Sequence, residues 1–264
     1  MILKVRKTTS KCTKGLIIMS KFSSNHPQES EDTAEFSSRP AHNRLTRPTL
    51  PEAIVGLVVL GVVTFGGGSQ LSRLGLDPVV YGLVLTALSG VAGIAGFAAA
   101  VLLRIRSLSA FGVRPVSRRW LFIGAGAGLV AFVVKSLAVL AYIEITGNSV
   151  PYQTMYAEGG SGGVLSLILA TLFISFLTPL GEELLFRGVI TTVLLRHGRP
   201  VIAVVGSALT FAIAHGITVF PAALLVGLIT AEIYRRSGSV WPAVVVHIVY
   251  NLPQLPLMVA AGIG

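Results

Sequence analysis

Six polar residues stand out in the apolar final third of the chain, because their types and spacing suit hydrolytic chemistry. They are Glu182, Glu183, Arg187, His215, His247 and Asn251. A glutamate can activate a water molecule, an imidazole can share the proton or hold a metal, and histidine and asparagine can donate hydrogen bonds to an oxyanion. An ionisable group in a membrane span costs about 2.5–3.5 kcal/mol at the bilayer centre. Such groups need a partner or a function, so the set predicts a hydrolytic site.

The spacing within each group predicts which side chains share a helix face. Adjacent residues project about 100° apart on a helix, so Glu182 and Glu183 cannot share one role. Glu183 and Arg187 are four residues apart, the spacing of a same-face ion pair, which leaves Glu182 to face a cavity. His247 and Asn251 also point to one face, about 6 Å apart along the axis. Each polar group also has a purely structural explanation. Glu182 and Glu183 could be charges favoured at a helix start, His215 could be a single hydrogen-bonded histidine, and His247 with Asn251 could form hydrogen bonds between helices.

The elements that must position these residues are membrane helices. Hydrophobic residues make up 53% of the 264 residues and charged residues only 12%. This composition excludes a disordered chain, a coiled coil and an ordinary cytosolic enzyme. It predicts an all-α polytopic integral membrane bundle of about seven to eight spans. The runs that we interpret as spans are 53–66, 79–103, 120–143, 163–181, 200–217, 219–235 and 239–262, and the amphipathic segment 182–197 either extends the fourth or lies at the interface.

The distribution of charge predicts the domains and the orientation. Residues 1–52 are rich in Lys, Arg and Ser and are predicted to be a disordered basic cytosolic tail, whose first residue is Met1 or Met19. N-terminal transmembrane helices would occupy 53–162, and a catalytic transmembrane core 163–264. Most other basic residues lie in the connectors 104–119, 196–199 and 235–238, whereas the loop 144–162 has none. This asymmetry predicts a multi-pass protein of the cell membrane with a cytosolic N-terminus.

The net charge of +10 and the small residues bear on partners. In a membrane protein this charge favours anionic lipid headgroups as partners, rather than nucleic acid. Gly124 and Gly128, and Gly90, Gly93 and Gly96, predict close helix packing within the bundle. A homodimer interface is the alternative use, and the oligomeric state stays open.

The order of the motifs resembles a known family. Glu-Glu-x-x-x-Arg, then Phe-x-x-x-His, then His-x-x-x-Asn is similar to the pattern of the CPBP intramembrane proteases over roughly residues 165–255. These include the type II CAAX prenyl endopeptidases and the related bacteriocin-processing and Abi proteins. The resemblance implies a catalytic cavity inside the bilayer, open toward the cytosol. The chain departs from the family in its number of spans, which is about seven, whereas relatives have eight.

The resemblance also implies a role for each matching residue. Glu182 and His215 would activate the attacking water, and His247 and Asn251 would stabilise the oxyanion. Glu183 and Arg187 would support and position Glu182. The implied substrate is a peptide or protein with an apolar or lipidated segment, either a CAAX-type C-terminus or a bacteriocin-like leader.

A metal cofactor stays open. Glu182, His215 and His247 could supply a zinc site, as the metalloprotease label of the family suggests. The chain has no His-Glu-x-x-His motif, and water activation by glutamate and histidine needs no ion, so we favour a metal-free mechanism. The single cysteine, Cys12, excludes a multi-cysteine metal site.

Two other functions compete with this hypothesis. A rhomboid-type serine protease would pair Ser161, in the run Gly159–Gly163, with His215, but that run is more typical of a flexible connector. A non-enzymatic membrane immunity or scaffold protein would use the same buried polar residues structurally.

Overall fold

The computed structural model describes residues 47–147 and 154–260, which all belong to one compact unit, Ala41–Gly264. The predicted tail therefore lies almost entirely outside the described residues. Within these two ranges the ordered elements are helices, and there is no strand. The α-helices are α1 Leu50–Gly61, α2 Gly67–Arg73, α3 Pro78–Leu103, α4 Arg118–Thr146, α5 Thr154–Ser161, α6 Val164–Leu172, α7 Thr178–Glu183, α8 Thr192–His197, α9 Pro200–Ala214, α10 Phe220–Ser237, α11 Val240–Asn251 and α12 Gln254–Ala260.

Several of these helices join end to end through π-helical segments. The π-helical segments are η3 Val62–Gly66, η5 Phe173–Leu177 and η6 Leu184–Thr191, and a short 3₁₀ turn, η4, covers Leu108–Phe111. Because η5 and η6 connect α6, α7 and α8, the fourth predicted span continues through the amphipathic segment as far as His197.

The prediction of an all-α multi-pass membrane bundle is confirmed, but with fewer complete spans. Within the described residues, 5 helices are long and apolar enough to cross a membrane: Leu50–Arg73, Pro78–Leu103, Arg118–Thr146, Val164–His197 and Val240–Ala260. The other two predicted spans fall short for different reasons. The helix α9 has 15 residues, about 22 Å at ~1.5 Å per residue. The helix α10 has 18 residues, but its last turns carry Glu232, Arg235 and Arg236.

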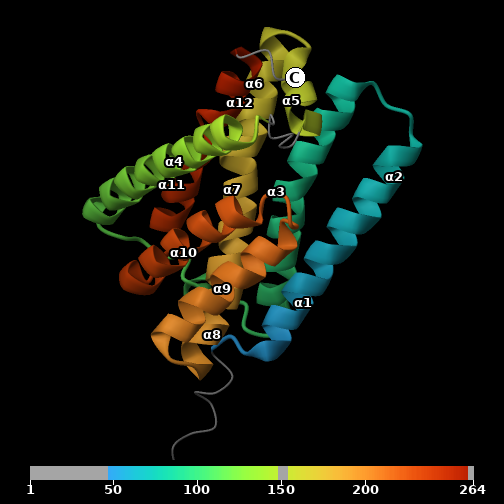
Figure 1. The fold of residues 1–264 in the computed structure, drawn as a ribbon. Helices are drawn as coiled ribbons and strands as arrows, with labels where there is room; N and C mark the ends of the chain where they lie inside the picture. The colour runs from blue at the N-terminus through green and yellow to red at the C-terminus, as the bar shows by residue number, and fades with distance from the viewer. Residues whose placement is uncertain (1–46, 148–153, 261–264) are drawn as a thin grey trace, which may run out of the picture. The chain divides into compact units, whose positions relative to one another are not determined.

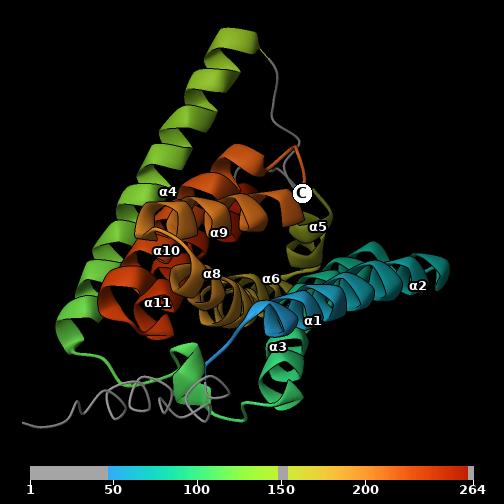
Figure 2. The same ribbon diagram turned by 90° about the horizontal axis from the view of Figure 1, so that it is seen from below.

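The helices pack around two central rods (Figure 1). The first rod is α3, and the second is the continuous helix from α6 to α8, which packs against α3 through α7. The helix α1 covers α3, whereas α11 contacts α7 and is itself covered by α4. Figure 2 shows α4 and the α1–α2 helix on opposite sides of this arrangement. The helix α9 packs on α10, so its C-terminal end is brought to the same region as α7 and α11.

The first helix begins earlier than the boundary at residue 52 predicts. Thr49 donates to Glu52 Oε2 from its backbone nitrogen at 2.7 Å and from Oγ1 at 2.9 Å, and α1 starts at Leu50. Arg104 Nε, at the end of α3, lies 2.5 Å from Oε1 of the fully buried Glu52. The hydrogen bond to Glu52 raises the pKa of Arg104 above its usual value. A capping box and an ion pair therefore hold residues that the sequence pattern had placed in the tail.

The small residues predicted to pack helices closely do so within the bundle. Gly124 and Gly128 face α11, and a methyl group on either would overlap a backbone carbonyl oxygen, that of Pro242 or of Val246. Gly93 of α3 meets the backbone of Gly181 on α7 in the same way. Because backbones touch at these points, the polar residues of α7 and α11 are fixed with little freedom to shift.

We expect Gly128→Ala to destabilise the fold by about 1–3 kcal/mol, because the added methyl group meets the backbone of α11. The matched control is Gly126→Ala in the same helix, where a Cβ atom meets nothing within 4 Å. The control should be neutral or slightly stabilising, since alanine favours helix. Thermal unfolding of the purified variants in mild detergent measures the difference. Equal melting temperatures for the two variants would contradict the packing described.

Candidate active site

Glu182 lies inside the second central rod, where the helix departs from regular α geometry on both sides. The π-helical segments η5 and η6 flank the short α7, and Pro179 in its first turn cannot donate a backbone hydrogen bond. Thr191 and Thr192 stabilise η6 by donating from their hydroxyls to carbonyl oxygens five residues back, at 2.9 and 3.2 Å. π-Helical segments are frequent at functional sites because they re-aim side chains.

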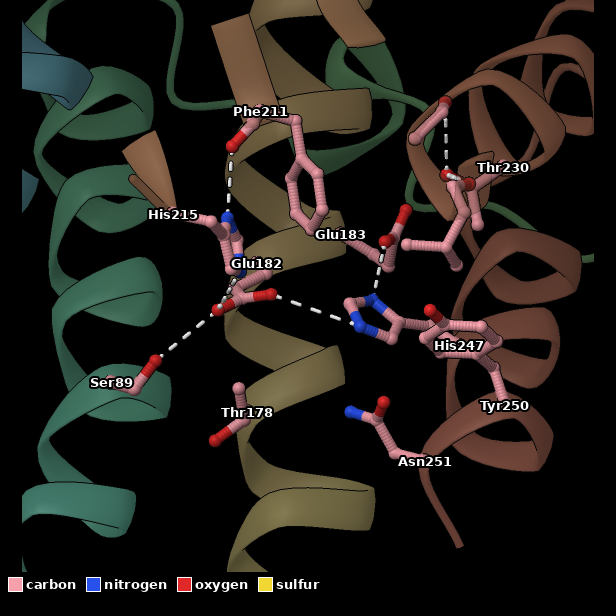
Figure 3. A network of polar contacts seen from close by, with 12 residues as sticks. Ser89, Thr178, Glu182, Glu183, Phe211, His215, Thr230, His247, Tyr250 and Asn251 are labelled. Atoms are coloured by element: carbon pink, nitrogen blue, oxygen red, sulfur yellow. Dashed lines mark hydrogen bonds and ion pairs between the residues drawn. The ribbon is translucent and has the colours of Figure 1, made fainter. Parts of the chain in front are cut away.

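Two imidazoles face the Glu182 carboxylate from two other helices (Figure 3). His215, at the C-terminal end of α9, places Nε2 3.5 Å from Glu182 Oε1. His247 of α11 places Nε2 3.9 Å from Glu182 Oε2. Glu182 is only 5% exposed, and its Oε2 accepts no hydrogen bond from the described residues. The three sequence motifs, which contribute Glu182, His215 and His247, thus meet at one buried carboxylate.

In both imidazoles, Nδ1, the ring nitrogen away from Glu182, lies beside a hydrogen-bond acceptor, and this contact fixes the orientation of the ring. His215 Nδ1 lies 2.8 Å from the backbone oxygen of Phe211, and a carbonyl can only accept, so Nδ1 carries the hydrogen. His247 Nδ1 lies 2.8 Å from Glu183 Oε1, and an ionised carboxylate likewise accepts. In both rings the nitrogen that can gain or lose a proton toward Glu182 is therefore Nε2.

Glu183 and Arg187 form the predicted pair, and Glu183 has a second neighbour. Arg187 Nε lies 3.0 Å from Glu183 Oε2, an ion-pair contact whose angle is not that of a hydrogen bond. Both side chains are fully buried. Arg187 Nη2 donates to the backbone oxygen of Gly227 at 3.2 Å, and its guanidinium carbon lies 4.6 Å from the centre of the Phe211 ring. Glu183 also contacts His247, and the support of Glu182 by the pair stays a prediction.

Asn251 lies one helical turn beyond His247 on α11. Its Nδ2 donates to the backbone oxygen of Ile174 at 3.0 Å, in the π-helical segment η5. A side-chain amide has two N–H bonds, so one remains for a ligand. Figure 3 shows this amide beside His247, as the i,i+4 spacing predicts.

Sequence reasoning missed two further polar groups near Glu182. Ser89 of α3 donates from Oγ to Glu182 Oε1 at 3.2 Å. Burial raises the pKa of Tyr156 on α5, and the negative charge of Glu182 raises it further. Serine and tyrosine are common in membrane helices and turns, and only the position of Ser89 beside Gly90, at the close approach of α3, offered a signal.

The contacts described for Ser161 and His215 do not support the serine-protease alternative. The hydroxyl of Ser161 donates to the backbone oxygen of Glu158 at 2.8 Å, and the residue is exposed at the end of α5. The described polar partners of His215 are Phe211 and Glu182. The glycine-rich run is helical up to Ser161, rather than a flexible connector throughout.

The described side chains do not fit a metal site. Within residues 47–147 and 154–260, no group of three or more His, Cys, Asp or Glu side chains is placed to hold a metal ion. This holds for Glu182, His215 and His247 as well, so zinc remains a prediction from the sequence alone.

We expect Arg187→Lys to lower stability by about 1–3 kcal/mol, because lysine cannot bond Gly227, face Glu183 and stack on Phe211 at once. Arg236→Lys is the matched control, since that arginine is exposed and pairs with Glu232 on the surface. Melting temperatures in the same detergent compare the two. If Arg236→Lys lost as much stability as Arg187→Lys, the buried contacts of Arg187 would contribute no more to stability than a surface ion pair does.

Comparison with known proteins agrees with this geometry. Residues 164–253 match the family model described as type II CAAX prenyl endopeptidase Rce1-like, and this range contains all six predicted site residues. No curated protein and no solved structure matches the chain. This match confirms the resemblance of residues 164–253 to the CPBP family of intramembrane proteases that the sequence motifs predicted.

Proposed function

We propose that the chain is an intramembrane endopeptidase in which Glu182 and His215 activate a water molecule. The observation that carries the proposal is the position of the Glu182 carboxylate between two imidazole Nε2 atoms, at 3.5 and 3.9 Å. The family match supports the reaction class, since the matched family is one of endopeptidases. The carboxylate would take up the proton, and the imidazoles would keep it near the reacting bond.

The first step is attack by water on the carbonyl carbon of the scissile peptide bond. Water donates one hydrogen bond to Glu182 Oε2, the buried oxygen that accepts no hydrogen bond from the described residues. As the carbon–oxygen bond forms, the water proton moves to Glu182, and the carbonyl oxygen becomes an oxyanion. His215 Nε2 shares this proton, because its Nδ1 is already committed to Phe211.

The oxyanion would be stabilised by His247 and Asn251. His247 would donate from Nε2, while its Nδ1 stays in contact with Glu183 Oε1 at 2.8 Å, which orients the ring. Arg187 Nε lies 3.0 Å from the other carboxylate oxygen of Glu183 and would hold that side chain in place. The second N–H of Asn251 completes the pair of donors, and removal of one such donor typically costs about 10²–10³ in kcat.

The second step breaks the carbon–nitrogen bond. The proton held between Glu182 and His215 passes to the leaving nitrogen, which departs as an amine. The oxyanion collapses to a carboxylic acid, so the water has been divided between the two products. Both carboxylates and both imidazoles return to their starting states.

The substrate would be a membrane-bound peptide. All six residues lie within or beside apolar helices, so a segment must enter the bilayer region to reach them. A prenylated C-a-a-X terminus, an apolar terminus and a bacteriocin-like leader each meet this requirement. The matched family favours the C-a-a-X class.

We expect Glu182→Gln to lower kcat/KM by about 10²–10⁴, because the amide cannot accept the proton of water. Hydrolysis of a farnesylated C-a-a-X peptide by protein in lipid nanodiscs measures the rate. Ser161→Ala should retain the wild-type rate. Equal cleavage by Glu182→Gln and wild type would refute the role of Glu182. A folded wild type that cleaves neither this peptide nor a leader peptide would favour the immunity or scaffold function.

We also expect hydrolysis to persist after prolonged treatment with 1,10-phenanthroline, since the proposed water activation uses only Glu182 and His215. The same peptide assay, with and without added zinc, measures this. Activity that disappears with the chelator and returns with zinc would contradict a metal-free mechanism.

A further inference from the structure

Lys135 is a cation inside the α4 span without a carboxylate partner among the described residues. Its Nζ donates to Gln254 Oε1 at 2.7 Å and lies 4.2 Å from the centre of the Tyr250 ring. The Phe132 ring is 5.3 Å away. An amide and two rings stabilise an ammonium group, but none of them supplies a negative charge. Since a charge within a span is costly, its position predicts an anionic ligand.

The contacts of Lys135 continue the row of site residues on α11 and α12. Tyr250 has its ring centre 6.3 Å from that of His247. Gln254 follows Asn251 at the start of α12. His247, Asn251 and Gln254 are spaced by four and three residues, the spacing of one helix face, although α11 ends at Asn251. At a helical rise of ~1.5 Å per residue, Gln254 lies about 10 Å beyond His247 in the direction of the α11 axis.

We infer that Lys135 binds the C-terminal carboxylate of the peptide substrate. The inference rests on the proposed function and adds a requirement for a free chain end. An extended peptide advances about 3.3 Å per residue, so about 10 Å holds three residues after the scissile bond. A C-a-a-X box has three residues after its cysteine, and the matched family is named for that box.

The depth of Lys135 favours a peptide terminus over a lipid phosphate. The residue lies about eleven residues before the end of α4 at Thr146, or about 16 Å along the axis. Lysines that reach headgroups by extending their side chains lie near helix ends. A carboxylate that enters with the substrate can reach this depth, because the scissile bond must itself reach His247.

The test measures binding without hydrolysis. A fluorescent farnesylated peptide with a reduced scissile bond is prepared as the free acid and as the C-terminal amide. Both are titrated against wild type and Lys135→Met in phosphatidylcholine nanodiscs. For wild type we expect the amide to bind about tenfold more weakly, the effect of losing one charged hydrogen bond. Lys135→Met should bind acid and amide equally, and Lys135→Arg should keep the preference for the acid.

Three results would overturn the inference. Wild type would bind both peptides equally, Lys135→Met would weaken both by the same factor, or phosphatidylglycerol would abolish the preference of wild type for the acid. The second result assigns Lys135 to packing, and the third assigns it to a headgroup. Lys135→Gln replaces Lys135→Met if the latter melts at a lower temperature than wild type. A preference for the acid without hydrolysis of the normal peptide would contradict the proposed function alone.

Discussion

A carboxylate buried inside an apolar helix is the constraint on which the remaining structure depends. Glu182 and Glu183 are adjacent, but only Glu183 has a guanidinium beside it. Glu182 is surrounded instead by Ser89 and by two imidazoles, which can each change charge. A guanidinium is a permanent cation, whereas an imidazole can exchange a proton with a neighbouring carboxylate. The two adjacent glutamates thus have different surroundings, and those of Glu182 are the ones that suit the proposed chemistry.

This arrangement requires helices that approach more closely than large side chains permit. The backbone of Gly93 meets that of Gly181, one residue before Glu182, and Gly128 admits α4 against α11 beside Val246, one residue before His247. The sites of closest backbone contact are therefore neighbours in sequence of Glu182 and His247. The π-helical segments around α7 then aim Glu182 and Glu183 toward different partners. The close backbone contacts at the glycines therefore fix the positions of the polar side chains next to them.

Much of the site could be predicted from the sequence, because its signals are local. Polar residues in apolar runs identified all six side chains, and the i,i+4 spacing predicted the ion pair of Glu183 with Arg187. The partner of Glu183 on α11 could not be predicted, since that contact joins residues far apart in the chain. Ser89 and the burial of Glu52 were missed for the same reason. The sequence pattern has about seven apolar runs, whereas the described residues contain 5 helices long and apolar enough to span, because hydropathy alone does not reveal that α9 is short or that α10 ends in charges.

The most direct test of the shared site is the ¹⁵N spectrum of its two histidines in ¹⁵N-histidine-labelled protein in nanodiscs. The chain has 5 histidines, so the resonances of His215 and His247 can be assigned by single substitutions. If Glu182 lies between their Nε2 atoms, Glu182→Gln will shift the Nε2 resonances of both rings and leave those of His197 unchanged. Nε2 resonances of His215 and His247 that are identical in wild type and Glu182→Gln would contradict the account, because the three groups would then not form one site.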